Sequence, residues 1–302
     1  MGRRKHGMDI HGILLLDKPA GISSNRALQK VRGIFQARKA GHTGSLDPFA
    51  TGMLPICLGE ASKTAAFMLE AGKRYRAKAR LGVATATGDV EGEVVQTLPL
   101  PDIDPGTLAQ ALKRFEGEIE QVPPMYSALK HEGKPLYEYA RAGIVIERPA
   151  RCVTIHQLNL LDWQAPDLTF EVHCSKGTYI RTLAEDIATA LGSCAHLVEL
   201  RRMLVEPFAN TPMLTLEQLQ EAKDNAGLSE VLLPADAGLV DWPRIDIDEI
   251  EQGKYQHGQQ FPVQGGNSPT GQVRVYDGEG HLLGLAEISA DGNLQPTRVF
   301  NL

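Results

Sequence analysis

The segment that ends at residue 81 constrains the fold more than any other part of the chain. Over Arg74–Leu81, apolar side chains and cations alternate strictly. The apolar members are Tyr75, Ala77, Ala79 and Leu81, and the cations are Arg74, Arg76, Lys78 and Arg80. Successive side chains of a strand point to opposite faces of a sheet. This pattern therefore predicts a strand with one face on a core and one basic face open to water or phosphate.

The distribution of charge along the chain is uneven. The 302 residues carry a net charge of -6, which taken alone argues against a nucleic-acid partner. Residues 1–80, however, contain 15 Lys and Arg against 5 Asp and Glu, a net of +10. Residues 81–210 carry a net of -7 and residues 211–302 a net of -9. This asymmetry indicates a polyanion site in the first part of the chain, with solvated surface charge as the alternative.

Length and composition place the chain among folded globular proteins. Hydrophobic residues make up 42 % and charged residues 23 %, which excludes disordered, collagen-like and coiled-coil classes. The length suggests two domains. Predicted strands alternate with predicted helices up to about residue 222. Ser23 and Ser24 can cap the first helix, whose apolar positions follow the helical period. Met53–Leu58 is expected to be a strand interrupted by Pro55, and Glu60–Leu69 a helix. From about residue 259 onward the chain shows short β-like runs with glycine-rich turns.

Nothing in the sequence points to a membrane or to a metal. The longest aliphatic run, Ile13–Leu16, is far shorter than the ~18 residues of a membrane span. No signal-type apolar segment follows the basic residues 3–5. The cysteines form no zinc-ribbon spacing and fit reduced thiols; they are Cys57, Cys152, Cys174 and Cys194. We expect a cytoplasmic protein with no membrane association and no metal site.

Asp47 is the first candidate for chemistry. It lies in Gly41–Gly52, a loop of twelve residues that holds three glycines and one proline, and it directly precedes that proline, Pro48. An Asp-Pro pair in such a loop is commonly a turn, whereas the alternative is a catalytic carboxylate held by a rigid loop. The loop lacks both the Gly-Lys-Ser/Thr of a phosphate-binding loop and the GxGxxG of a dinucleotide site. A single carboxylate next to a basic strand indicates catalysis on a polyanionic substrate.

Tyr75 and Arg181 each allow two interpretations. Tyr75 fits core packing, but an aromatic beside cations is also typical of a base-stacking platform. Arg181 falls close to the apolar side of a predicted helix, where a partly buried Arg needs a carboxylate. Glu185 at the next helical turn and Asp47 are both candidates, and spacing does not choose between them.

Five segments taken in order resemble the TruB family, bacterial tRNA pseudouridine synthases that act on uridine 55 of the T loop. They are Leu16–Pro19 with Ser23-Ser24, Gly41–Pro55, Arg74–Arg76, Gln121–Lys130 and Ser175–Arg181. Any one of these motifs can arise by chance. Five in register between about residues 10 and 205 make the resemblance specific.

The resemblance implies roles for particular residues. Asp47 would be the catalytic aspartate and Arg181 its partner. Tyr75 would stack on the target base, and His42 would fill the stack that the flipped uridine vacates. The remaining base and substrate contacts would be Leu200 and Tyr179, with Lys18 supporting the catalytic loop. The residues that contact the RNA backbone would be Arg74, Arg76, Lys78, Arg80 and Lys130.

The same resemblance implies the architecture. We expect an α+β pseudouridine-synthase fold, with a central mixed, mostly antiparallel sheet flanked by helices. The catalytic domain would cover residues 1–245, with a thumb-like insertion at about 122–150. A small β-rich PUA-like domain would follow at 246–302 and would bind RNA.

The implied activity is conversion of uridine 55 in the TΨC arm of tRNA to pseudouridine by base flipping. This isomerisation breaks C1′–N1 and joins C1′ to C5 without redox chemistry, so we expect no cofactor. We also expect a monomer without an obligatory protein partner. The alternatives are a non-catalytic RNA-binding or tRNA-folding protein and a guide-RNA-dependent synthase of the dyskerin type. The 121–147 insertion and the acidic C-terminal part favour the stand-alone bacterial form.

Overall fold

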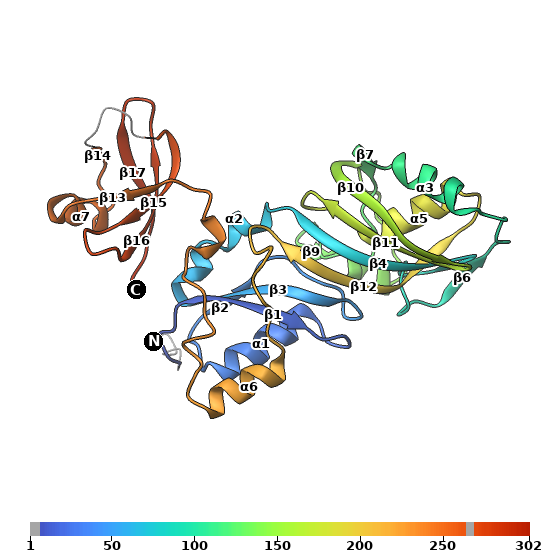
Figure 1. The fold of residues 1–302 in the computed structure, drawn as a ribbon, viewed down its shortest axis with the longest axis horizontal. Helices are drawn as coiled ribbons and strands as arrows, with labels where there is room; N and C mark the ends of the chain where they lie inside the picture. Colours follow the sequence, from blue (N-terminus) through green and yellow to red (C-terminus); the bar gives the residue numbers. More distant parts are fainter. Residues whose placement is uncertain (1–6, 264–268) are drawn as a thin grey trace.

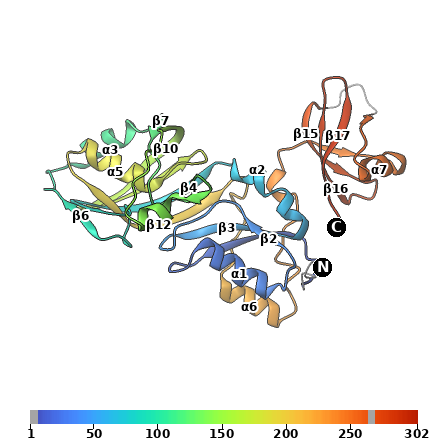
Figure 2. The same ribbon diagram turned by 180° about the vertical axis from the view of Figure 1, so that it is seen from behind.

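The computed structural model describes residues 7–263 and 269–302, so the basic residues 3–5 lie outside the described part. The chain forms an elongated molecule with a large sheet and a separate small sheet at one end (Figure 1). The C-terminus lies in the small sheet's domain, close to the first strands of the chain (Figure 2).

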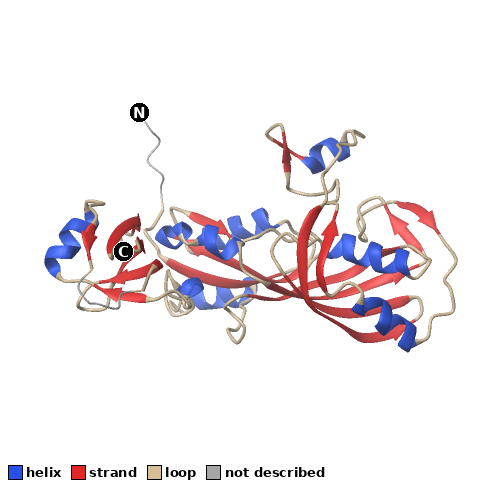
Figure 3. Ribbon diagram, turned by 90° about the horizontal axis from the view of Figure 1, so that it is seen from above, coloured by secondary structure: helices blue, strands red, loops and turns tan. Residues whose placement is uncertain are grey.

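The large sheet has eight strands, and the strands at its centre position the candidate functional site. Along the sheet, in spatial order, run β1 (Gly12–Lys18), β3 (Thr51–Leu58), β12 (Ala195–Val205), β4 (Lys73–Leu81), β11 (Asp167–Cys174), β10 (Arg151–Gln164) and β7 (Gly117–Gln121), with β2 (Ala40–His42) paired to β3. Every pairing is antiparallel except that of β12 with β3. The expected mixed, mostly antiparallel sheet is therefore confirmed, and its long twisted strands are plain in Figure 3.

Strand β4 has the predicted two-sided character. Its apolar series is buried, whereas the cations that alternate with it are exposed or half-buried; they are Arg74, Arg76, Lys78 and Arg80. The apolar side packs in one core with Leu183 and Ile187 of α5 and Leu108 of α3. The cationic side faces away from that core, as expected for an antiparallel sheet with one wet face.

Helices cover two parts of the sheet. The helices are α1 (Ser24–Ile34), α2 (Ala65–Leu69), α3 (Pro105–Lys113), α4 (Leu136–Arg141), α5 (Ile180–Ala190), α6 (Leu216–Asp224) and α7 (Glu249–Gln256). Helices α3 and α5 pack near β10 and β12, whereas α1 and α6 lie side by side beneath β1 and β3 (Figures 1 and 2). Ser23 caps α1 by accepting the Arg26 N–H at 3.2 Å, as its position before the apolar series predicts.

Two local predictions were wrong. The strand expected to break at Pro55 runs unbroken as β3, because residues on both sides of Pro55 stay paired with β1 and β2 and its carbonyl accepts the Thr43 N–H at 3.1 Å. The helix expected over Glu60–Leu69 is split into a 3-10 helix (Gly59–Lys63) and α2. Thr64 separates them, and its hydroxyl bonds to the Ala61 carbonyl at 2.8 Å.

The segment between β7 and β10 makes an excursion from the sheet. It holds the short strands β8 (Lys130–His131) and β9 (Lys134–Pro135), followed by α4. A second ribbon, β5 (Val83–Thr85) with β6 (Val94–Thr97), follows β4 directly. The excursion coincides with the insertion expected at 122–150.

The C-terminal sheet has five strands and its own core. They are β13 (Arg244–Asp246), β15 (Gly271–Tyr276), β16 (Leu282–Ile288), β17 (Asn293–Val299) and β14 (Phe261–Pro262). The boundary expected after residue 245 falls within β13. The small domain is anchored on the large one: Leu285 and Phe300 share a core with Met68, and Arg274 pairs with Asp236 at 2.9 Å.

Candidate active site

The Asp47 loop connects β2 to β3 and is fixed on both sides of the carboxylate. Before it, the Ser24 hydroxyl accepts the Leu46 N–H at 2.8 Å and lies 3.0 Å from the Leu46 carbonyl, to which it donates. After it, the buried Lys18 ammonium donates to the Pro48 carbonyl at 3.2 Å. Two anchors this close to Asp47 restrict where its side chain can point.

Arg181 reaches the Asp47 carboxylate with two nitrogens. Its Nε lies 3.1 Å from Oδ2, and its Nη2 lies 3.3 Å from Oδ1. Of the two partners that spacing left open, the structure therefore pairs Arg181 with Asp47. No ion pair to Glu185 is formed in residues 7–263 and 269–302. A two-point guanidinium–carboxylate contact fixes orientation as well as charge.

The same guanidinium ties two other segments to the site. It donates to the Thr87 carbonyl and to the Tyr126 carbonyl, each at 2.7 Å. It also lies 3.4 Å from Oδ2 of Asp89, a carboxylate that is 2 % exposed. Asp89 in turn accepts from the Thr87 hydroxyl at 2.6 Å. Arg181 thus joins the Asp47 loop, the ribbon after β4 and the start of the insertion.

A cavity of about 600 Å³ opens at this ion pair. Five of the residues expected to act on the substrate line it: Asp47, Tyr75, Tyr179, Arg181 and Leu200. The rest of its wall comes from the Asp47 loop, the insertion, the segment before α5, and the side chains of Leu69, Lys73 and Arg202. Its size and its mixture of apolar and polar walls are typical of a small-molecule or nucleotide site.

Burial sets the protonation of the groups in the cavity. Burial raises the pKa of the Asp47 carboxyl, the Arg181 guanidinium opposes that rise, and Asp89 adds to it. Burial also raises the pKa of the Tyr75 phenol, so it is protonated at neutral pH. The Asp47 side chain remains 35 % exposed toward the cavity, where a substrate can reach it.

Several expected site residues lie elsewhere. His42 ends β2 and does not line the cavity; burial lowers its pKa, and its Nδ1 has no partner among the described residues. Lys130 is exposed on the insertion, next to the lining residue Leu129.

The face of β4 opposite Tyr75 carries four cations, because their positions alternate with it; they are Arg74, Arg76, Lys78 and Arg80. Lys78 and Arg80 pair with Asp167 of β11 at 3.3 and 2.8 Å. Arg74 lies 3.9 Å from Glu171. The structure therefore does not bring these cations to the cavity, and their contact with RNA stays a prediction.

Sequence reasoning missed the residues that support the cavity. Arg202 is 1 % exposed, sits opposite Tyr75 in the pairing of β12 with β4, and donates to the Met53 and Gly44 carbonyls at 2.6 and 3.1 Å. The sequence feature that could have revealed Arg202 is a cation within the apolar series Leu200–Leu204. Gln121 holds the backbone of Tyr179 from both sides, since its Oε1 accepts the N–H at 3.0 Å and its Nε2 donates to the carbonyl at 3.3 Å. No local pattern marks Gln121.

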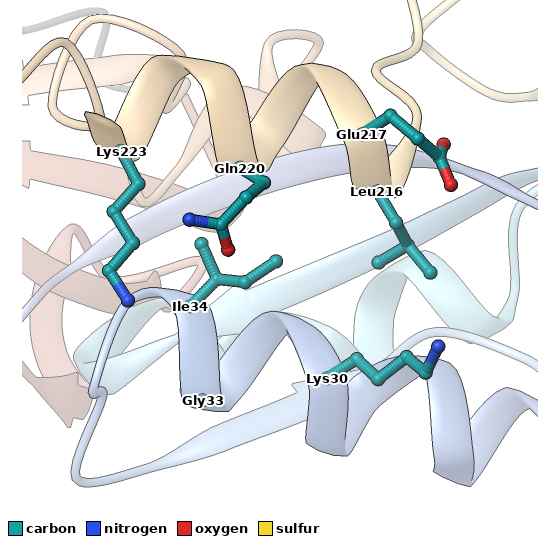
Figure 4. Close-up of a pocket in the computed structure, with 7 residues that line it drawn as sticks. All are labelled: Lys30, Gly33, Ile34, Leu216, Glu217, Gln220 and Lys223. Carbon is teal, nitrogen blue, oxygen red and sulfur yellow. The ribbon is translucent and has the colours of Figure 1, made fainter. Parts of the chain in front are cut away.

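A second hollow lies between α1 and α6 and is lined from both helices (Figure 4). It measures about 370 Å³, and its charged members are Lys30, Glu217 and Lys223. It contains neither Asp47 nor Arg181 and is open to solvent. We therefore place the chemistry in the larger cavity.

Within residues 7–263 and 269–302, no group of His, Cys, Asp and Glu could hold a metal ion. In the same described ranges, no helix is long and apolar enough to cross a membrane. The four cysteines are free thiols, and Cys152 alone among them is exposed.

Comparison with known proteins identifies the family. Three family models match successive segments: TruB family pseudouridylate synthase (N terminal domain) at residues 32–180, tRNA pseudouridylate synthase B C-terminal domain at 181–240, and Pseudouridine synthase II TruB, C-terminal at 243–300. A protein of Actinobacillus succinogenes named tRNA pseudouridine synthase B is 50 % identical, covering 100 % of this chain and 98 % of its own. The chain belongs to the TruB family. A Pseudomonas aeruginosa TruB protein of the same name is also 50 % identical, over 96 % of both chains.

Solved structures confirm the TruB fold. The structure titled "Crystal Structure of a Cbf5-Nop10-Gar1 Complex" matches with a TM-score of 0.74 and 26 % identity, over 96 % of this chain and 85 % of that one. The expected pseudouridine-synthase fold, with its β-rich C-terminal domain, is therefore correct.

Proposed function

We propose that this chain isomerises uridine 55 in the T loop of tRNA to pseudouridine, with Asp47 as the catalytic carboxylate. The two-point contact between Arg181 and Asp47, at 3.1 and 3.3 Å inside the cavity that Tyr75 lines, carries the proposal. The name tRNA pseudouridine synthase B, borne by relatives about half identical over nearly the whole chain, supports both the reaction and the tRNA substrate.

The reaction needs an ionised carboxylate next to the sugar. The C1′–N1 bond breaks, C1′ joins C5, the proton on C5 leaves, and N1 gains a proton. Asp47 either attacks C1′ or takes the C2′ proton to give a glycal-like intermediate. In both routes the Arg181 cation favours the charged form of the carboxyl that burial disfavours. No redox step or external group enters, so the reaction needs no cofactor.

The target uridine must leave the base stack before Asp47 can reach its sugar. Flipping a base costs a few kcal/mol. The Tyr75 ring gives the flipped base a new stacking surface, with Leu200 and Tyr179 completing the cavity. His42 fills the vacated position in the RNA. Together these contacts offset the cost of flipping.

The substrate contacts extend to the T arm. The 122–150 insertion closes on the arm as a thumb, and Lys130 meets its backbone. The PUA-like C-terminal domain adds RNA contacts. The chain acts as a monomer in the cytoplasm, with no obligatory protein partner.

Mapping pseudouridine in an unmodified tRNA transcript tests this function. Incubation with the chain alone gives pseudouridine at position 55 and at no other uridine. A guide-RNA-dependent synthase needs a guide before any uridine reacts, and a non-catalytic RNA-binding protein gives none. Unmodified uridine 55 after complete binding of the transcript refutes the proposal.

A further inference from the structure

One end of the cavity is formed by the start of helix α5. The helix has 11 residues, its N-cap Tyr179 makes no side-chain capping bond, and its first turn holds no acid. The first N–H groups of a helix have no intrahelical partner, and the helix dipole is positive there. Thr178, Tyr179 and Ile180 line the cavity at this point. A first turn left without a cap at a cavity wall is suited to an anion.

Ser127 gives an independent indication that the cavity binds a polar ligand. It lies in the insertion, lines the same cavity and is 6 % exposed. Burial raises the pKa of the Tyr179 phenol and the nearby Ser127 hydroxyl opposes that rise, but no group in the described ranges meets Ser127 Oγ at hydrogen-bonding geometry. Buried hydroxyls are nearly always hydrogen-bonded, so an unpaired one at a cavity wall indicates a partner that arrives with the substrate.

Lys73 adds a cation to the wall of the same cavity. It begins β4 on the Tyr75 side and pairs with Cys174, directly before the segment 175–178 that leads to α5. Its Nζ donates to the Ala71 carbonyl at 2.5 Å and the Leu69 carbonyl at 3.2 Å, which leaves one of three N–H donors. No carboxylate lies within ion-pair distance of it in residues 7–263 and 269–302.

Arg202 strengthens the positive field around Lys73. The backbone of Gly44 lies between them, and a Cβ there would be 3.7 Å from Arg202 Nη1 and 3.8 Å from Lys73 Cε. Burial, and then Arg202, lower the pKa of Lys73 to about 8. Glu70 and Glu206 oppose this lowering, but neither forms an ion pair with Lys73 in the described ranges. Two buried cations without an ion-paired carboxylate at Lys73 favour a bound anion.

We propose that Lys73, the Ser127 hydroxyl and the first turn of α5 bind a phosphodiester next to the nucleotide whose base enters the cavity. This inference rests on the proposed function, because it takes RNA as the source of the phosphate. It assigns backbone recognition inside the cavity to groups that are distinct from the exposed cations of β4. The phosphate is thereby held while Asp47 acts on the adjoining sugar.

Neutral phosphate analogues test the subsite. A T-arm stem–loop carries a methylphosphonate either 5′ or 3′ of the target uridine, or at a distant stem position. Binding is measured with Asp47→Asn protein, so that turnover does not interfere. We expect one flanking methylphosphonate to weaken binding about tenfold, the size of a lost charge-assisted contact. In the same background, Lys73→Met removes that sensitivity, whereas Lys113→Met, on the exposed side of α3, keeps it.

Two results overturn the subsite. One is that neither flanking methylphosphonate weakens binding more than the stem control. The other is that the Lys73→Met protein loses the same factor as its parent. Ser127→Ala, which removes only a hydroxyl, provides a second variant if Lys73→Met does not fold. If the subsite is correct, this variant also loses less binding than its parent when the flanking phosphate is a methylphosphonate. An unchanged loss of binding contradicts the assignment. Pseudouridine formation by the wild-type chain on the unmodified stem–loop is measured in parallel, so failure of the proposed function is seen separately.

Discussion

Arg181 Nε lies 3.1 Å from Asp47 Oδ2, across a contact between the second residue of α5 and the loop after β2. A cation at this end of a helix is disfavoured by the helix dipole. The carboxylates of Asp47 and Asp89, both close to the guanidinium, offset that cost. Arg181 and Asp89 both affect the ionisation of Asp47: Arg181 lowers its pKa and Asp89 raises it.

Arg181→Gln tests the electrostatic part of this account. Removing a cation that lowers the pKa of Asp47 leaves burial unopposed, so that pKa rises further. Because the ionised carboxylate acts, the activity of the variant starts to fall at a higher pH as the solution is acidified. At neutral pH we expect kcat to drop about 100-fold or more, since one partner of a buried pair is lost. A pH–rate profile with an unmoved acid limb contradicts the role given to Arg181.

Asp89→Asn should move the same acid limb in the opposite direction. Asp89 raises the pKa of Asp47, and Asn keeps the hydrogen-bonding shape without the charge. In this variant Arg181 is less firmly held, because it loses one charge-assisted contact. We therefore expect kcat to fall about tenfold. Opposite shifts in Arg181→Gln and Asp89→Asn would be hard to produce by general destabilisation, whereas shifts in the same direction count against the shared-guanidinium arrangement.

Ser24→Ala tests the anchor of the catalytic loop. The change leaves the buried Leu46 N–H and carbonyl without their partner, and we expect a loss of about 1–3 kcal/mol in unfolding free energy. The loop also loosens, so kcat falls. Ser23→Ala is the matched control, because it removes the α1 cap at a cost of about 1 kcal/mol and leaves the loop contact intact. Equal kcat values for the two variants would show that Ser24 contributes stability alone.

The exposed cations of β4 are tested by salt dependence. Arg76 is exposed and makes no ion pair in the described ranges, whereas Lys78 and Arg80 share Asp167. If this face meets RNA backbone, Arg76→Ala lowers the slope of log K against log salt by about one phosphate contact. Arg80→Ala has a smaller effect because its charge is already paired. An unchanged slope in all single variants of the four cations removes this strand from the RNA interface.

Local pattern was sufficient for much of the fold. The alternation over Arg74–Leu81 produced β4 with the predicted faces, and Ser23 capped α1 where the apolar period starts. Pro55 misled the strand prediction, since a proline removes one donor but does not remove the pairing of its neighbours. The helix after β3 split at Thr64 through a side-chain bond that periodicity does not register.

The sequence predicted site residues only where they lie in motifs that resemble the family. The resemblance placed Asp47, Tyr75, Tyr179, Arg181 and Leu200 together, and the structure brings these five to one cavity. Spacing alone left Glu185 open as the partner of Arg181, because the Asp47 contact joins segments 134 residues apart. Gln121 likewise acts through a contact to a residue 58 positions away, which no local pattern encodes.

The most direct test is tritium release from tRNA labelled at C5 of uridine. Wild-type protein on an unmodified transcript is expected to release tritium from one uridine, and a transcript with cytidine at position 55 releases none. Asp47→Asn protein binds the transcript with similar affinity and also releases none. Release that persists without uridine 55, or sustained turnover by Asp47→Asn, contradicts the central claim that Asp47 isomerises this one nucleotide.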